Sequence, residues 1–207
     1  MKNIFFLLLT FSYSINAQEV LKDSTRVQNL EEVIVSSIRV DDNIPIAYNN
    51  LSKDEISDRN LGQDLPILLN FLPNVVTTSD AGAGIGYTGI RIRGINSQST
   101  NVTINGIPYN DAESNLTYWV DLPDFSSSIE NLQVQRGIGT SVNGSGAFGA
   151  SINILTDNIS QDPFFESNNT LGSYNTYKNT FRFSTGLLND VFEFSGRLSK
   201  IDSDGYI

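Results

Sequence analysis

The region from residue 89 to residue 156 limits the possible folds most strongly, because short β-prone runs alternate there with glycine-rich turns. Apolar residues recur at every second position of these runs, which is the period of a strand, and the runs are too short for ordinary helices. Asn105-Gly106 between two runs is the strongest short signal for a hairpin. Four charged residues lie among the Ile, Leu and Val of this region: Arg91, Arg93, Glu130 and Arg136. A compact domain with several short strands is therefore expected.

A leucine stripe upstream of these strands predicts a short core helix. Leucines recur at helical spacing at positions 65, 68, 69 and 72, and Pro73 ends the run. Asp64 is expected to cap the helix, and Pro66 lies in the first turn, where a missing N–H is harmless. Residues 38–57 are expected to form one or two strands and a turn, and residues 123–128 one helical turn. Mixed strands and short helices in one compact unit indicate an α+β domain.

The pattern changes after Pro163, where three longer alternating runs cover residues 164–171, 177–185 and 191–201. Such runs are typical of transmembrane barrel strands, whose apolar side chains face lipid and whose polar side chains face the lumen. A soluble β-sandwich produces a similar alternation. The residues of this region by themselves leave both interpretations open.

The composition excludes several classes of function. The chain has 13 basic and 23 acidic residues and a formal net charge of -10, whereas nucleic-acid binding needs clustered Lys and Arg. It has no Cys and no His, so thiol nucleophiles, Ser-His-Asp triads and Cys/His metal sites are impossible within it. Neighbouring acids such as Asp41 and Asp42 point to opposite sides of a strand and do not converge on a substrate. Neither an enzyme active site nor a metal or cofactor site is expected.

The first 17 residues have the pattern of a secretory signal peptide. Lys2 supplies the positive charge, and residues 4–11 form an apolar run far shorter than the roughly twenty residues of a spanning helix. Cleavage is expected after Ala17, with an uncleaved anchor as the alternative; in both cases the chain leaves the cytoplasm. Residues 18–37 are expected to form a flexible leader. Its β-prone end at residues 30–36 could add to the edge of a partner's sheet, or form the first strand of the domain.

In their order and spacing, these motifs resemble the plug domain of TonB-dependent outer-membrane receptors. The resemblance covers about residues 30–160 and rests on the set of motifs rather than on any single one. They read Ile92-Arg93-Gly94, Asn105-Gly106-Ile107-Pro108, Ile129-Glu130, Arg136-Gly137 and Gly149-Ala150-Ser151-Ile152-Asn153-Ile154. The chain departs from the family pattern at Asn74 and Ala150, where the family has Gly, and at Asn105, where the family usually has Asp.

The resemblance implies an α+β plug domain followed by the first antiparallel strands of a transmembrane β-barrel. It implies a signal peptide at residues 1–17, a leader with a TonB-box-like strand at 18–37, the plug at 38–160 and the start of the barrel at 161–207. Three strands cannot close a barrel, and open sheet edges are not tolerated in lipid. We therefore expect the sequence to be a fragment of a longer receptor.

The resemblance also implies roles for three sets of residues. The TonB-coupling strand corresponds to Leu30, Glu31, Glu32, Val33, Ile34, Val35 and Ser36. Contact between plug and barrel is assigned to four charged side chains, which could alternatively face solvent: Arg91, Arg93, Glu130 and Arg136. Ligand contact on the apical loops is assigned to six side chains, of which the aromatic ones could alternatively be packing residues: Tyr87, Asn96, Gln98, Tyr109, Tyr118 and Trp119.

The function implied by the resemblance is active uptake across the bacterial outer membrane. The expected partners are TonB, the periplasmic energy-coupling protein, a small scarce ligand such as a ferric siderophore or another metal complex, and outer-membrane lipid. No enzyme activity, cofactor or nucleic acid is implied. The alternative is a soluble exported β-rich binding or adhesion module; a secreted hydrolase is a poorer fit, because no catalytic set can be assembled. The sequence does not name the ligand.

Overall fold

The computed structural model describes residues 39–139, 143, 146–156 and 158–206. The expected signal peptide and the expected coupling strand at residues 30–36 lie outside the described residues. Within the described ranges, no helix combines the length and the apolar character needed to cross a membrane.

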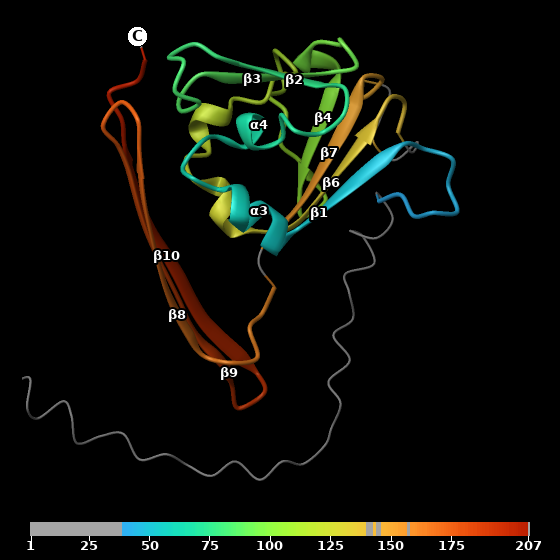
Figure 1. Ribbon diagram of the computed structural model, residues 1–207. Coiled ribbons are helices and arrows are strands. Elements are labelled where there is room, and N and C mark those ends of the chain that lie inside the picture. The colour runs from blue at the N-terminus through green and yellow to red at the C-terminus, as the bar shows by residue number, and fades with distance from the viewer. Residues whose placement is uncertain (1–38, 140–142, 144–145, 157, 207) are drawn as a thin grey trace, which may run out of the picture. The chain divides into compact units, whose positions relative to one another are not determined.

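A five-stranded sheet forms the centre of the N-terminal domain (Figure 1). Its strands lie in the order β1 (Tyr48–Ser52), β6 (Ile129–Arg136), β7 (Ala150–Thr156), β4 (Thr100–Ile104) and β5 (Ile107–Pro108). Only β4 and β7 are parallel; the other neighbours are antiparallel. The expected hairpin is confirmed between β4 and β5, because Asn105 and Gly106 both adopt positive φ, of 51° and 81°, as a tight hairpin turn requires.

The expectation for residues 38–57 is wrong in part, because helix α3 (Lys53–Arg59) follows directly after β1. Its start is a capping box: the Ser52 side chain accepts from the Glu55 N–H, and the Glu55 carboxylate accepts from the Ser52 N–H at 2.9 Å. Each of these bonds satisfies a backbone donor that a helix start would otherwise leave free. The sequence carries this signal, since Glu55 stands three residues after Ser52.

Helix α4 (Leu65–Leu68) is shorter than the leucine stripe that predicts it, although all four leucines of the stripe are buried as expected. Asp64 occupies the N-cap position, but its side chain does not cap the helix. Instead the carboxylate accepts a hydrogen bond from the Thr88 hydroxyl at 2.9 Å. Burial raises the pKa of Asp64 to about 6, against the opposing effect of the hydrogen bonds from Thr88 and the Gly86 N–H.

A second, two-stranded sheet pairs β2 (Val75–Ser79) with β3 (Thr88–Ile92). Asn74 precedes β2 with φ of 62°, so it takes the left-handed conformation for which the family uses Gly. The remaining elements are the single turns η1 (Ser97–Ser99), η2 (Trp119–Asp121) and η3 (Phe125–Ser128). The last of these confirms the helical turn expected at residues 123–128.

The hydrophobic core lies between one face of the five-stranded sheet and the helices α3 and α4. Leu132, Ile152 and Ile154 of the sheet are joined there by Ile56 of α3 and by the leucines of α4. Trp119 is also in this core and is only 3% exposed. Trp119 therefore packs in the core of this domain, and its contact with a ligand stays a prediction.

The opposite face of the same sheet is polar and buried. A row of polar side chains crosses four strands, since Asn50, Gln133, Asn153 and Thr103 stand opposite one another in the strand register. Two bonds join the row: Gln133 donates to Asn50 Oδ1 at 2.8 Å, and Thr103 donates to Asn153 Oδ1 at 2.8 Å. This face therefore relies on hydrogen bonds, where the other relies on apolar contact.

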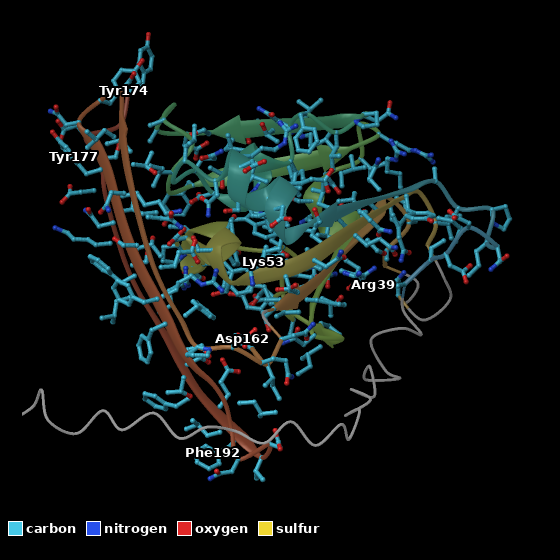
Figure 2. The ribbon with its side chains drawn as sticks, turned by 60° about the horizontal axis from the view of Figure 1, so that its bottom comes forward. Arg39, Lys53, Asp162, Tyr174, Tyr177 and Phe192 are labelled. Carbon is cyan, nitrogen blue, oxygen red and sulfur yellow. The ribbon has the colours of Figure 1, made fainter. Side chains whose placement is uncertain are left out.

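Three long strands form a separate antiparallel sheet in the order β10 (Phe192–Asp202), β9 (Thr176–Leu188) and β8 (Phe164–Gly172). Figure 2 shows Tyr174 and Tyr177 at one end of this sheet and Phe192 at the other. The strand register places Lys178, Thr180 and Arg182 on one face. The opposite face carries Phe181, Phe183 and Leu198, together with the polar side chains of Asn179, Lys200 and Asp202. Many of the apolar side chains are exposed: Phe165, Leu171, Tyr177, Phe181, Phe194 and Leu198.

Candidate functional site

The N-terminal domain and the three-stranded sheet are joined by a buried carboxylate, Asp124. It immediately precedes η3 and has a left-handed φ of 50°. Lys178 of β9 lies with its Nζ 2.7 Å from Asp124 Oδ1, and the two side chains are only 3% and 1% exposed. Arg197 of β10 approaches Asp124 Oδ2 to 3.2 Å and also donates to the Asp124 carbonyl oxygen. Two cations from two strands therefore converge on one carboxylate of the domain.

Hydroxyl groups complete the coordination of the Asp124 carboxylate. Thr180 of β9 donates to Oδ2 at 2.8 Å, Ser199 of β10 donates to the same oxygen, and Ser127 of η3 donates to Oδ1 at 2.6 Å. Burial alone would raise the pKa of Asp124, but the bonds from Lys178, Ser127 and Ser199 outweigh it and hold the pKa below its ordinary value. Asp124 is thus an anion with donors from both sides of the junction, which we call the Asp124 anchor.

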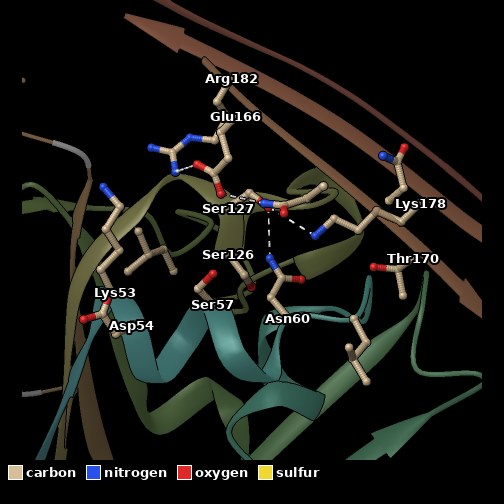
Figure 3. A pocket seen from close by; sticks show the side chains of 14 residues that line it. Lys53, Asp54, Ser57, Asn60, Ser126, Ser127, Glu166, Thr170, Lys178 and Arg182 are labelled. Atoms are coloured by element: carbon tan, nitrogen blue, oxygen red, sulfur yellow. Dashed lines mark hydrogen bonds and ion pairs between the residues drawn. The ribbon is translucent and has the colours of Figure 1, made fainter. Parts of the chain in front are cut away.

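A polar cavity of about 380 Å³ lies beside the Asp124 anchor (Figure 3). Asn60 and Ser127 line it from the domain, and Lys178 and Arg182 line it from β9. Arg182 is paired across the strands with Glu166 of β8, at 3.3 Å. Such a polar junction contains hydrogen-bonding groups throughout, so it can be wet without leaving buried polar atoms unsatisfied.

Glu130 faces the same junction from the domain side. Its Oε2 lies 2.8 Å from Lys53 Nζ of α3, and both side chains are partly exposed. The two residues line a cavity of about 590 Å³ together with Glu193 and Arg197 of β10. Glu130 is therefore held by its own domain while it borders the three-stranded sheet.

The arginines predicted to contact the barrel lie at a different place, away from the Asp124 anchor. Arg93 and Arg136 line one groove of about 590 Å³, together with the exposed Ile138 and Phe148. Arg136 donates to the Pro73 carbonyl oxygen at 3.3 Å, and Arg93 follows β3 with a left-handed φ of 54°. Arg91 is exposed on β3, on the face opposite the buried Ile residues. The structure thus brings Arg93 and Arg136 together and leaves Arg91 and Glu130 apart from them.

The residues predicted to contact ligand differ widely in exposure. Tyr87 is 67% exposed and Tyr118 is 44% exposed, whereas Tyr109 packs against the core. Asn96 and Gln98 are exposed beside η1 and share a weak bond of 3.4 Å. Four of the six candidates are therefore accessible on loops.

The loop between β2 and β3 contacts the end of the three-stranded sheet. The Tyr206 N–H donates to the Ala81 carbonyl oxygen at 2.8 Å, and the Tyr206 ring lies edge-on to Tyr174 at 5.4 Å between centroids. Asn175 donates to Asp204 Oδ2 at 2.6 Å in the same region. A loop of the domain and the turn between β8 and β9 thus meet at one rim with exposed aromatic rings.

The sequence reasoning missed Asp124 and its cations. Lys178 and Arg182 occupy alternate positions of the run at residues 177–185, on the face predicted to be polar, so their direction could have been read from the alternation. Asp124 gives no such signal, because its segment lacks a period. No group of three or more Asp, Glu, His or Cys side chains suited to a metal ion occurs among the described residues.

Comparison with known proteins agrees with this architecture. The family model for the TonB-dependent Receptor Plug Domain matches residues 40–151. The vitamin B12 transporter BtuB of Vibrio vulnificus is 31% identical over 206 residues, which are 97% of this chain and 31% of that relative. The chain therefore spans about a third of the length of the curated relative it matches.

Solved structures share the fold at low identity. The ferric yersiniabactin uptake receptor FyuA of Yersinia pestis aligns with a TM-score of 0.56 at 17% identity, over 74% of this chain and 24% of that one. The ferripyoverdine receptor of the Pseudomonas aeruginosa outer membrane aligns with a TM-score of 0.59 at 16% identity, over 78% and 21%. The α+β domain carries the plug fold, and antiparallel strands follow it. The chain therefore belongs to the TonB-dependent receptors of the bacterial outer membrane, and residues 40–151 match their plug domain.

Proposed function

We propose that this chain is the plug and first barrel strands of a transporter that imports a scarce metal chelate, using energy delivered by TonB. The observation that carries the proposal is the junction at Asp124, where a domain that matches the plug family attaches to strands whose other face exposes many large apolar side chains. In a soluble sandwich the apolar face would be the buried one. A polar inner face against a plug and an apolar outer face toward lipid suit a barrel wall instead.

A ferric chelate is the proposed ligand class. Two of the similar structures are, by their names, receptors for ferric yersiniabactin and ferripyoverdine, and the curated relative is a vitamin B12 transporter. The proposed contacts are the accessible loop residues Tyr87, Asn96, Gln98 and Tyr118. Transport of this kind makes and breaks no covalent bond, so the protein is proposed not to be an enzyme.

The groove at Arg93 and Arg136 is the proposed second contact between plug and barrel. Two arginines lie there beside the exposed apolar side chains Ile138 and Phe148, and carboxylates on the facing barrel wall would pair with them. Barrel strands beyond residue 207 would supply them. Arg91 and Glu130 are proposed to contribute at the edges of this contact and of the Asp124 junction.

The proposed route of energy is the leader. Residues 30–36 would pair with an edge strand of TonB through backbone hydrogen bonds, and a pull on this strand would open the plug. Replacing Val35 by Pro in the full-length receptor removes one N–H donor of that ladder. Whole cells are tested for uptake of a panel of labelled ferric siderophores and labelled cyanocobalamin. In the variant, uptake of the ligand that the receptor imports is expected to stop. Binding of that ligand to isolated outer membranes is expected to stay unchanged.

The control for this experiment is Val35→Ala, which keeps the backbone donor and should import normally. Undiminished uptake by Val35→Pro would overturn the role of this strand. Loss of binding in Val35→Pro would point to misfolding instead, and would count against a separate coupling element.

The groove is tested by the double variant Arg93→Ala and Arg136→Ala in the full-length receptor. If both arginines hold the plug against the barrel, ion leakage through receptor in planar bilayers should rise. Arg91→Ala is the comparison, because this exposed side chain lies outside the groove and should change leakage less than the double variant does. Equal leakage in wild type and double variant would assign both arginines to solvent.

A further inference from the structure

Val40 is tied to the polar face of the plug sheet through one side chain, Gln133 of β6. The Val40 N–H donates to Gln133 Oε1 at 2.8 Å, and Gln133 Nε2 donates to the Val40 carbonyl oxygen at 2.9 Å. A single side-chain amide therefore pairs with both backbone groups of one residue, as a neighbouring strand would. Val40 is 4% exposed and Gln133 is 1% exposed, so water does not compete for these bonds.

Gln133 is held in place by further bonds within the sheet. Its Nε2 also donates to Asn50 Oδ1 of β1 at 2.8 Å, and its Oε1 also accepts from Gln135 Nε2 at 2.9 Å. Both N–H groups and both acceptor positions of the amide are thus in use. An acid at this position would lack the donors, and an apolar side chain would make none of the four bonds.

Arg39 strengthens the attachment next to Val40. Its guanidinium donates to the Asn131 side-chain oxygen, and to the carbonyl oxygens of Asn131 at 3.4 Å and Asn153 at 3.2 Å. Asn131 precedes Gln133 by two residues, so both side chains lie on the same face of β6. Two consecutive residues of the entering chain are therefore bound mainly by β6, with one further bond from Arg39 to β7.

We propose that Gln133 is a clasp through which a pull on the leader reaches the central strand β6 before it reaches the edge strand β1. Residue 40 stands between the leader and β1, which begins at Tyr48. Tension that enters from the N-terminal side first loads the bonds that Arg39 and Val40 make to the sheet, and β1 is loaded only after these bonds open. The clasp positions the leader and sets the first step of plug release. This inference rests on the proposed coupling to TonB for its use in transport, but the clasp itself can be tested without TonB or ligand.

Hydrogen exchange on the full-length receptor in detergent tests the clasp. Gln133→Met removes all four bonds at nearly unchanged side-chain length, and the Val40 amide is then expected to exchange about tenfold faster or more. Gln135→Met is the comparison, with the same change on the same strand and face: it removes one bond that holds Gln133, so its effect on the exchange of Val40 should be clearly smaller. Unchanged exchange at Val40 in Gln133→Met, or an equal rise in both variants, would overturn the clasp.

Single-molecule pulling from the N-terminus of the membrane-embedded full-length receptor tests the order of release, and wild type alone suffices. The first rupture is expected to free the roughly eight residues between Val40 and β1, a gain of about 2–3 nm, before any longer step. Gln133→Met should lower the force of this first event, because only the Arg39 bonds then hold the segment, and Gln135→Met should change that force much less. A first event in wild type that releases β1 directly would contradict the inference. Normal uptake by Val35→Pro would instead contradict the proposed function and would have no bearing on the clasp.

Discussion

The plug is attached at two places that use opposite chemistry. At the Asp124 anchor, a buried carboxylate meets Lys178 and Arg197 of the barrel strands. At the clasp, the neutral amide of Gln133 meets the backbone of Val40. Hydrogen bonds to a charged group are roughly twice as strong as those between neutral groups. The comparison indicates a strong attachment to the wall and a weaker one to the leader, so a pull should open the leader side first.

Removing the carboxylate of the Asp124 anchor should have the largest effect. Asp124→Ala leaves the buried Lys178 without its anion and should weaken the plug–barrel attachment by about 3–5 kcal/mol. Hydrogen exchange of η3 and of the β9 peptides in the full-length receptor measures the loss. Asp202→Ala is the control, because its pair with Lys200 on β10 is exposed and should matter little. Equal protection from hydrogen exchange in Asp124→Ala and wild type would contradict a strong attachment at the Asp124 anchor.

The core below the Asp124 anchor should be almost as sensitive. Trp119 is buried on η2, a few residues before Asp124, so its ring holds the segment that carries the anchor. Trp119→Ala should cost about 3–5 kcal/mol of plug stability through the cavity it creates. Tyr118→Ala, at an exposed neighbour, should leave stability nearly unchanged. Thermal unfolding of the plug, monitored by its sensitivity to protease, compares the two variants. Unchanged stability of the Trp119→Ala plug would contradict the role of Trp119 in the core and would make it a candidate for ligand contact again.

Asp64 and Asp124, both buried in the described part of the plug, should respond to pH with opposite sign. Folding raises the pKa of Asp64 to about 6, so its contribution to stability is present below about pH 4 and is lost as the pH rises through 6. The loss amounts to at most about 3 kcal/mol. Asp64→Asn should abolish this pH dependence of stability. Hydrogen exchange of the α4 and β3 peptides between pH 4.5 and 7.5 measures it. Identical pH slopes in variant and wild type would count against a raised pKa.

Asp124 has a lowered pKa, so its contribution is present above the ordinary carboxyl pKa and is lost only as the pH falls through the lowered value. The plug–barrel attachment should therefore remain constant from pH 7 to pH 5. Protection of η3 that already falls at pH 5.5 would contradict the assignment of Asp124 as a stable anion.

The clasp should give the smallest effect on stability. Gln133→Met should cost about 1–3 kcal/mol, less than Asp124→Ala, because every bond lost is between neutral groups. The two variants measured side by side, by denaturation of the plug in the full-length receptor, test the ranking. A larger loss for Gln133→Met would reverse the proposed order of release.

The fold was largely readable from the sequence where local signals agree with tertiary packing. The Asn105-Gly106 hairpin, the buried leucine stripe and the long alternating strands all follow from turn chemistry and period. The sequence analysis did not predict helix α3, because short strands were expected there. Ser52 and Glu55 nevertheless have the spacing of a capping box.

The functional contacts were harder to predict, because they depend on which distant segments meet. Asp124 and Lys178 are far apart in sequence, and nothing near Asp124 signals a buried ion pair. The alternation of Gln133 and Gln135 with Leu and Val does indicate a polar sheet face, but not the backbone that it binds. The sequence likewise did not indicate that Trp119 is buried and Tyr118 is exposed, because the two residues are adjacent in the chain.

A reversible lock between β1 and β6 tests the central claim that a pull through the leader opens the plug for transport. The chain lacks Cys, and Tyr48 and Gln135 are opposed in the register next to a hydrogen-bonded pair, a spacing that suits a disulfide. In cells carrying the full-length receptor with Tyr48→Cys and Gln135→Cys, uptake of the labelled ferric chelate should stop after oxidation and return after reduction, with binding unchanged. Import by the oxidised receptor at the reduced rate would contradict the account.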